Sequence, residues 1–179
     1  MNMTYFLTND KVGLNKLTVE DMNKNYFNWM NDPDVTGGIT AGAFPNSHED
    51  IEQYVRSANA TKDSVLFGIF AVSTGEHVGN IRLSFIDYIN RTCMMGIIVG
   101  ERKMRGQGLG KAACELLITY AFNTLNLRKM WLYVLDDNKP AKKMYEQLGF
   151  ETEGYLKKHL FKNGRYQDLL VMSLFNSKK

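Results

Sequence analysis

A glycine-rich segment, Arg105–Gly110, lies between an expected strand and an expected helix, and it constrains the fold more than any other feature of the chain. Gly106, Gly108 and Gly110 have no Cβ, so the backbone N–H groups of this segment can come close to a ligand. The helix that follows adds N–H groups without intrahelical partners and a partial positive charge at its N-terminus. The segment therefore predicts a cradle for an anion such as a pyrophosphate.

Two common phosphate-binding motifs do not fit the spacing of this segment. A Walker A motif needs a glycine where Arg105 stands and a serine or threonine where Ala112 stands. A GxGxxG dinucleotide motif that starts at Gly106 needs a glycine where Lys111 stands. The strands before the segment also indicate an antiparallel meander and not the βαβ unit that the dinucleotide motif requires.

The hydrophobic pattern predicts an α/β or α+β domain with a mixed sheet. Strands are expected at Val12–Leu17, Val65–Val72, Val78–Tyr88, Thr92–Val99, Met130–Val134 and on both sides of the turn Asn163-Gly164. The Met130–Val134 strand is apolar throughout and is expected in the interior of the sheet. Helices are expected from Thr18 to Trp29, after the N-cap Ser47, over Gly108–Thr124 and from Asn138 to Gly149, and residues 37–45 are expected to be loop.

Composition narrows the function classes. With 179 residues the chain suits one domain, residues 1–179, and its 44% hydrophobic and 23% charged residues indicate a globular protein. No apolar run approaches the roughly 18–20 residues of a membrane helix, and the N-terminus has no signal-peptide pattern, so a cytoplasmic location and no membrane partner are expected. The net charge of +3 is small and the basic residues are dispersed, so no nucleic-acid partner is expected.

The cysteines and histidines show no metal-binding spacing. Cys93 and Cys114 form no CxxC motif, and His48, His77 and His159 are isolated from one another in the sequence. No metal site and no disulfide framework are expected, and the two cysteines are interpreted as buried thiols.

Two motifs together identify a family resemblance. Arg105, Gly108 and Gly110 fit the pattern Q/R-x-x-G-x-G/A, and residues 138–150 fit N-x-x-A-x-x-x-Y-x-x-x-G-F. With both motifs in this order, the sequence resembles the GNAT superfamily of acetyl-CoA-dependent N-acetyltransferases. The segments Trp29–Pro33 and Gly164–Asp168 resemble the branch that contains ribosomal-protein alanine, spermidine and nucleotide-amino-sugar acetyltransferases. The resemblance implies a mixed, largely antiparallel central sheet of about six to seven strands flanked by about four helices.

The resemblance also implies which residues bind acetyl-CoA. The backbone amides of Arg105–Gly110 would hold the CoA pyrophosphate, with Lys103 or Lys111 as an auxiliary cation. The end of the strand before this segment would separate from its neighbour and offer main-chain groups to the pantetheine arm, and one amide would polarise the thioester carbonyl. Asn138 would bond the pantetheine or order its own loop. The expected CoA-binding residues are Ile98, Val99, Arg105, Gly106, Gln107, Gly108, Leu109, Gly110, Lys111, Asn138 and Ala141.

Tyr145 is the expected catalytic residue. In the resemblance it protonates the departing thiolate, and a phenol with a pKa near ~10 can supply a proton to a thiolate whose acid has a pKa near ~8.5. The competing interpretation is that Tyr145 is an aromatic residue on a helix face, packed in the core.

The general base has no obvious candidate. Many members of the superfamily place a glutamate just before the glycine that matches Gly96, where this chain has Met95, preceded by Met94. The substitutes considered are Glu101, Asp87, His48, His159 or an ordered water molecule.

The sequence therefore predicts acetyl transfer from acetyl-CoA to a primary amine by direct attack in a ternary complex, because neither cysteine lies in the motifs. A CoA-binding sensor without catalysis is an alternative, and a nucleic-acid-binding module has too few basic residues. The favoured acceptor is a nucleotide-linked amino sugar, because a polyamine needs several converging carboxylates and an alkylamine with a pKa near ~10.4 needs a strong base. A protein N-terminal amine and a polyamine stay open as acceptors, and a homodimer stays open as an assembly.

Overall fold

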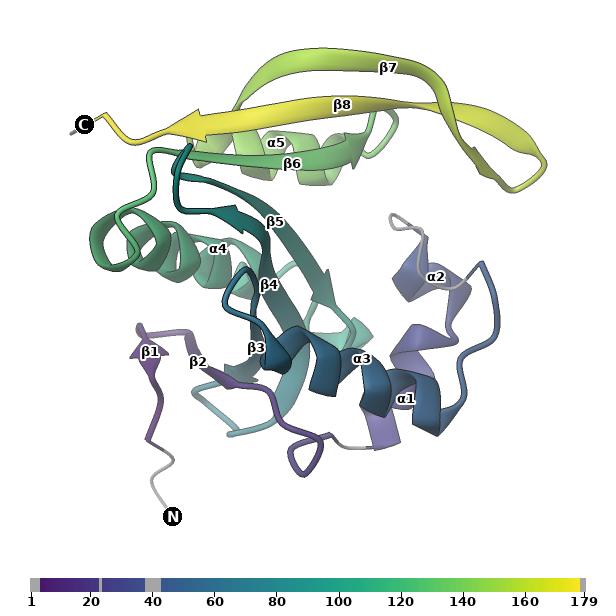
Figure 1. Ribbon diagram of the computed structural model, residues 1–179. Helices are drawn as coiled ribbons and strands as arrows, with labels where there is room; N and C mark the ends of the chain where they lie inside the picture. Colours follow the sequence, from purple (N-terminus) through teal and green to yellow (C-terminus); the bar gives the residue numbers. More distant parts are fainter. Residues whose placement is uncertain (1–3, 23, 38–42, 178–179) are drawn as a thin grey trace.

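The computed structural model describes residues 4–22, 24–37 and 43–177, and within them the strands form one mixed sheet (Figure 1). The expected loop at residues 37–45 lies partly outside the described residues. The strand order is β1-β2-β3-β4-β5-β6-β8-β7. The strands are β1 (Leu7–Thr8), β2 (Val12–Lys16), β3 (Val65–Ala71), β4 (His77–Asp87), β5 (Thr92–Val99), β6 (Lys129–Leu135), β7 (Glu151–Lys162) and β8 (Arg165–Phe175).

The sheet has one strand more than the upper expectation. The additional strand, β1, pairs only Leu7 and Thr8 with β2. Two residues are too few to show the alternation by which a strand is found in a sequence. The expected β7–β8 hairpin and the interior position of β6, between β5 and β8, are confirmed.

The helices are α1 (Lys24–Met30), α2 (Pro33–Thr36), α3 (His48–Ala60), α4 (Leu109–Thr119) and α5 (Lys139–Gln147), with a 3₁₀ turn η1 (Arg102–Met104) and a π-helical turn η2 (Tyr120–Thr124). The expectation that Ser47 caps a helix is confirmed, because Ser47 and Asp50 form a capping box at the start of α3. The expected helix over Gly108–Thr124 ends as α-helix at Thr119 and continues as the wider turn η2, which keeps Ala121 and Phe122 buried.

The prediction of a helix from Thr18 to Trp29 was wrong at its start. The backbone N–H and the hydroxyl of Thr18 both donate to the Asp21 carboxylate, at 3.0 and 2.8 Å. These bonds close a local turn instead of capping a helix, and α1 begins at Lys24. At the other end, Asp32 and Pro33 stop α1 and open a second helix, α2, with Asp32 as its N-cap.

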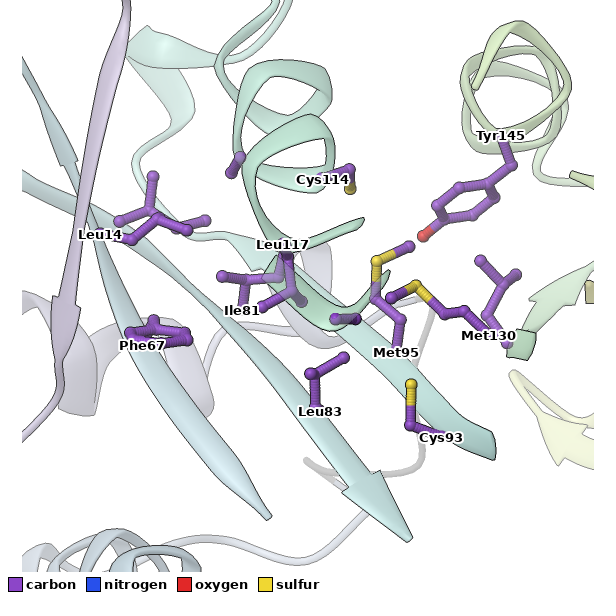
Figure 2. Packing of buried hydrophobic residues seen from close by; sticks show 14 of the residues in the cluster. Leu14, Phe67, Ile81, Leu83, Cys93, Met95, Cys114, Leu117, Met130 and Tyr145 are labelled. Atoms are coloured by element: carbon purple, nitrogen blue, oxygen red, sulfur yellow. The ribbon is translucent and has the colours of Figure 1, made fainter. Parts of the chain in front are cut away.

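The two faces of the sheet carry separate hydrophobic clusters. Strand β4 alternates, so that Ile81 and Leu83 face α4 and the larger cluster, while the residues between them face the other side. Figure 2 shows part of the larger cluster, in which Leu117 of α4 packs over these residues. On the opposite face, α1 and α3 pack through residues such as Trp29 and Val55. Within the described residues, no helix has the length and apolar character needed to cross a membrane.

Strands β5 and β6 form the only parallel pair among the described strands, and they pair over a short length. Thr92–Met94 pair with Lys129–Trp131, and beyond this point the two strands are not paired with each other. The last residues of β5, Met95–Val99, therefore border an opening in the sheet. The glycine-rich segment follows at the end of this stretch, which is paired with β4 but not with β6.

Candidate active site

A cleft of about 610 Å³ lies where β5 separates from β6, and we call it the loop cleft. The glycine-rich segment, the end of β5 and the start of α5 all contribute to its walls. Among the expected CoA-binding and catalytic residues, it is lined by Ile98, Val99, Arg105, Gly106, Gly108, Leu109, Gly110, Lys111, Asn138, Ala141 and Tyr145. Gln107 is not among the lining residues, and its side chain donates to the Lys103 carbonyl at 2.8 Å.

The backbone of the glycine-rich segment fits a diphosphate. Gly106 and Gly108 have φ angles of 78° and 80°, in the left-handed region that favours glycine. Gly108 is the N-cap of α4 and provides no side-chain hydrogen bond, so the first amides of the helix stay open. A Cβ on Gly106 would meet no atom within 4 Å, because it would project into open space. Space and unpartnered N–H groups thus coincide at the positive end of a helix.

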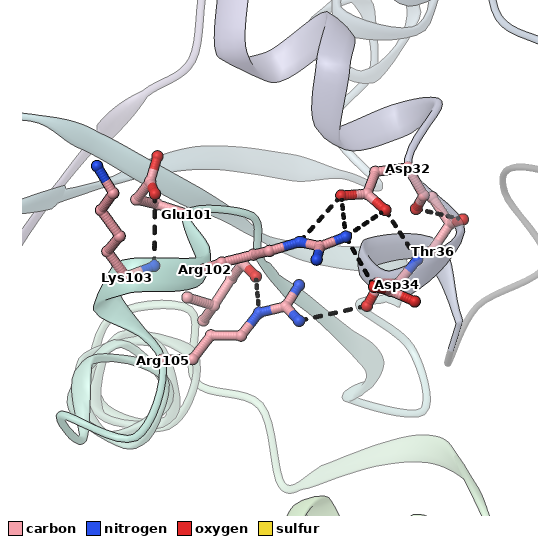
Figure 3. A network of polar contacts seen from close by, with 8 residues as sticks. Asp32, Asp34, Thr36, Glu101, Arg102, Lys103 and Arg105 are labelled. Carbon is pink, nitrogen blue, oxygen red and sulfur yellow. Dashed lines mark hydrogen bonds and ion pairs between the residues drawn. The ribbon is translucent and has the colours of Figure 1, made fainter.

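An ion-pair network fixes the outer wall of the loop cleft (Figure 3). Arg102 of η1 forms ion pairs with Asp32 and Asp34, each at 2.8 Å. Arg105 donates through Nε to the Val99 carbonyl at 3.1 Å and through a terminal nitrogen to the Asp34 carbonyl at 3.3 Å. The hydrogen bond from Arg102 holds the pKa of Asp32 below its usual value. The side chain of Arg105 thus braces the end of β5, a role that its place in the motif did not reveal.

Tyr145 lies in α5 with 7% of its surface exposed. It lines the loop cleft and also packs edge-on against Phe150, with 5.7 Å between ring centroids. Figure 2 shows its hydroxyl pointing toward the buried cluster that contains Met95 and Cys114. Burial raises the pKa of the Tyr145 phenol above its usual value. The side chain therefore keeps its proton at neutral pH. Its position at the cleft suits a proton donor, and its contact with Phe150 suits an aromatic residue of the core.

Asn138 and Ala141 are joined at the start of α5. Asn138 is the N-cap of the helix, and its Oδ1 accepts from the Ala141 backbone N–H at 3.3 Å. This contact orders the turn between β6 and α5, which is one of the two roles expected for Asn138.

A second cleft, of about 350 Å³, lies on the α1 and α3 side of the sheet, and we call it the strand cleft. Its floor is made by alternate residues of β4, namely Asn80, Arg82 and Ser84. Its walls come from α1 and α3 and include Tyr26, Met30, Ile51 and Tyr54. The two clefts share the β5 residues Gly96, Ile97 and Ile98. They therefore meet at the free end of β5.

None of the four candidate base residues lines either cleft. Glu101 caps η1, and Asp87 accepts N–H groups in the β4–β5 turn. His48 stacks on Phe27 with 3.9 Å between ring centroids, and His159 is exposed on β7. Met95, at the position where a glutamate was expected, is buried in the core and also lines the loop cleft. The described residues also bring together no group of three or more potential metal-binding side chains.

The sequence interpretation missed the polar residues of β4. Asn80, Arg82 and Ser84 alternate with apolar residues, a signal that the sequence does contain. Asn80 is 6% exposed and pairs across the strands with Ile98. The Nε2 of His77 lies 2.8 Å from Asn80 Oδ1, and because a carbonyl oxygen can only accept, this nitrogen carries the hydrogen.

His77 is buried among the rings of Trp29, Tyr26 and Phe70, and burial lowers its pKa. The unfolded chain binds a proton here near the ordinary pKa of about 6.5, whereas the folded chain resists it. We therefore expect His77 to contribute stability that is present above about pH 6.5 and is lost as the pH falls below it. Urea unfolding between pH 5 and 8 measures this, and the loss should be smaller in His77→Gln than in wild type. His159→Gln, on the exposed strand β7, is the control, and equal pH dependence in all three proteins would contradict the prediction.

Both cysteines are buried and free, as expected. Burial raises the pKa of Cys93 and of Cys114 to about 12, so both thiols are neutral at pH 7. Neither lines the loop cleft or the strand cleft. Neither thiol is thus placed to carry an acyl group.

Comparison with known proteins agrees with this geometry. The model of the acetyltransferase (GNAT) domain matches residues 11–151. The spermidine N(1)-acetyltransferase of Vibrio cholerae is 37% identical over 101 residues, which cover 56% of this chain and 58% of that protein. The L-amino acid N-acetyltransferase AaaT of Escherichia coli is 32% identical over 107 residues, covering 59% of this chain and 65% of that protein. The matches thus span little more than half the length of these relatives.

Solved structures show the same fold over a longer stretch. The spermidine N-acetyltransferase from Vibrio cholerae, in complex with CoA and spermine, superposes with a TM-score of 0.87. It is 27% identical, and the superposition covers 95% of this chain and 98% of that one. The family match extends from β2 to the start of β7 and includes both sequence motifs. The chain therefore belongs to the GNAT acetyltransferase family.

Proposed function

We propose that this chain transfers an acetyl group from acetyl-CoA to a primary amine, by direct attack of the amine on the thioester. One observation carries the proposal: the loop cleft and the strand cleft meet at Gly96, Ile97 and Ile98, where β5 has separated from β6. Two substrates that enter from opposite faces of the sheet would have their reacting groups side by side at this point.

Acetyl-CoA supplies the acetyl thioester, and the chain's own residues have the following roles. The open amides between Gly106 and Lys111 hold the pyrophosphate at the start of α4. The free edge of β5 at Ile98 and Val99 offers main-chain groups to the pantetheine arm and to the thioester carbonyl. Tyr145 donates its proton to the departing sulfur. An ordered water molecule removes the proton of the amine, because the four candidate bases lie outside both clefts.

The names of the relatives bear on which class of amine accepts the acetyl group. The relatives named above act on spermidine or on L-amino acids, and none of their names mentions a nucleotide-linked amino sugar. These names support the polyamine alternative better than the amino sugar that the sequence interpretation favoured. A homodimer and a cytoplasmic location stay predictions.

The test is release of free CoA thiol from acetyl-CoA in the presence of different acceptors. Spermidine, leucine, leucinamide and a UDP-linked amino sugar cover the acceptor classes under discussion. We expect thiol release with at least one primary amine, and none without an acceptor. A protein that binds CoA in calorimetry but releases no thiol with any acceptor would instead be the catalytically inactive CoA-binding sensor.

A further inference from the structure

We propose that Asn80 and Arg82 bind an oxygen atom of the acceptor, so that the acceptor is an α-amino carbonyl compound, either a free amino acid or a peptide N-terminus. The inference rests on the proposed function and narrows its acceptor.

Asn80 presents a hydrogen-bond donor without a partner. Its Oδ1 accepts from His77, and among the described residues its Nδ2 has no hydrogen-bond partner although the atom is buried. A buried N–H group without a partner is unfavourable, so a ligand atom that accepts from it is favoured. Asn80 lines the strand cleft, and because the carbonyl side of its amide is occupied, the N–H groups are the part of the side chain left for a ligand. An oxygen accepts from these groups, whereas an ammonium group cannot.

Arg82 adds a positive charge two residues further along the same face of β4. Its Nε donates to Ser64 Oγ at 2.8 Å, and its guanidinium lies over the Tyr54 ring at 5.2 Å from the centroid. In the described part of the chain, no carboxylate forms an ion pair with it. A half-buried guanidinium without a counter-ion favours a ligand that carries negative charge or a carbonyl dipole.

The carboxylates that a polyamine would need are engaged elsewhere. Asp32 and Asp34 pair with Arg102, and Glu52 pairs with Arg56. Asp50 does line the strand cleft, but one of its oxygens accepts both the backbone N–H and the hydroxyl of Ser47. With one such carboxylate and one guanidinium, the lining does not complement a chain of several ammonium groups.

The place of Asn80 fixes where the bound oxygen lies relative to the amine. Asn80 stands directly opposite Ile98 in the β4–β5 pair, and Ile98 lines both clefts. An oxygen held by Asn80 therefore lies close to the point where the amine attacks. This favours a carbonyl or carboxylate on the carbon next to the amine, and the apolar walls suit an apolar side chain beside it.

The experiment compares acceptors that differ by one group. Leucine has a carboxylate next to its amine, leucinamide has a carbonyl as a peptide N-terminus does, and isopentylamine has the same carbon skeleton with neither. We expect the wild-type kcat/KM for leucine or leucinamide, expressed per unprotonated amine, to exceed that for isopentylamine by at least about tenfold, with spermidine also below the better of the two. Whichever of the two is used better identifies a free amino acid or a chain terminus as the source.

Two variants assign the preference to the named residues. Asn80→Asp keeps the oxygen that accepts from His77 but loses the donor, and it should lower kcat/KM for the preferred acceptor at least about tenfold while isopentylamine changes less than about twofold. Arg82→Gln should lower kcat/KM for leucine more than for leucinamide. Asn123→Asp and Arg56→Gln make the same changes of charge on the exposed surface, away from both clefts, and should leave all rates unchanged.

The outcomes separate this inference from the proposed function. Turnover of spermidine ahead of both leucine compounds would overturn the inference and leave the acetyltransferase proposal in place. An equal loss for all acceptors in both variants, with a lowered Tm, would show a structural role only and would also overturn it. If no thiol were released with any of the acceptors, the proposed function itself would be wrong. Binding of leucine to the CoA complex in calorimetry, weakened by Asn80→Asp, supports the inference without relying on turnover.

Discussion

Tyr145→Phe is expected to lower kcat by roughly 10²–10⁴ while the KM for acetyl-CoA changes little. The substitution removes one oxygen and keeps the ring that packs against Phe150, so it separates proton donation from packing. A thiolate that leaves without a proton is a poorer leaving group, and the loss should therefore appear in the chemical step.

Two comparisons sharpen this prediction. With an acetyl thioester whose thiol is more acidic, the difference between wild type and Tyr145→Phe should shrink, because the leaving group needs the proton less. Tyr88→Phe is the matched control, since the exposed Tyr88 lines neither cleft and its hydroxyl donates to the Lys62 carbonyl. Full activity in Tyr145→Phe would mean that the residue serves the core alone.

Gly108→Val is expected to abolish binding of CoA. The φ angle of 80° is unfavourable for a β-branched residue, and the new side chain would stand where a phosphate must approach the amides at the start of α4. The strain itself costs about 1–3 kcal/mol, so the variant should fold with a lower Tm. Calorimetry with CoA measures the binding.

A second glycine provides the control for strain. Gly75, in the β3–β4 turn, has a φ of 72° and no atom within 4 Å of an added Cβ, so Gly75→Val has a comparable backbone penalty without a site nearby. It should lose stability and keep its affinity for CoA. If Gly108→Val bound CoA as tightly as Gly75→Val does, the segment would not be the phosphate cradle.

The parts of the fold with local signals could be predicted from the sequence. The β3–β5 meander and the hairpin at Asn163-Gly164 depend on the pattern within each strand and on short turns, and the N-cap at Ser47 depends on a single local residue. The start of α1 could not, because the same Thr18 and Asp21 pattern serves a capped helix and a closed turn equally well. The two residues of β1 are likewise too few to show a hydrophobic alternation in the sequence.

The glycine-rich wall of the site could be predicted, but the strand cleft could not. The wall depends on a motif of six contiguous residues, and all of these except Gln107 line the loop cleft. The strand cleft depends on Asn80 standing opposite Ile98, which is a matter of register between two strands. The engagement of Asp32 by Arg102, across 70 residues of chain, also depends on tertiary structure.

The short β5–β6 pairing joins the two halves of the described sheet, β1–β5 and β6–β8, over only three residue pairs. The strands are joined only as far as Met94 and Trp131, and β5 continues for five residues to Val99. At about 3.3 Å per residue this stretch is roughly 16 Å long, and because it stays paired with β4, a rotation of about five degrees between the two halves of the sheet moves its end by roughly 1.4 Å relative to β6. Displacements of about 1 Å at reacting groups can change rates by about 10². Residues of α4 and α5 belong to the same buried cluster as residues of β5 and β6. Substitutions deep in the core, far from any bound substrate, should therefore alter the rate through the width of the opening.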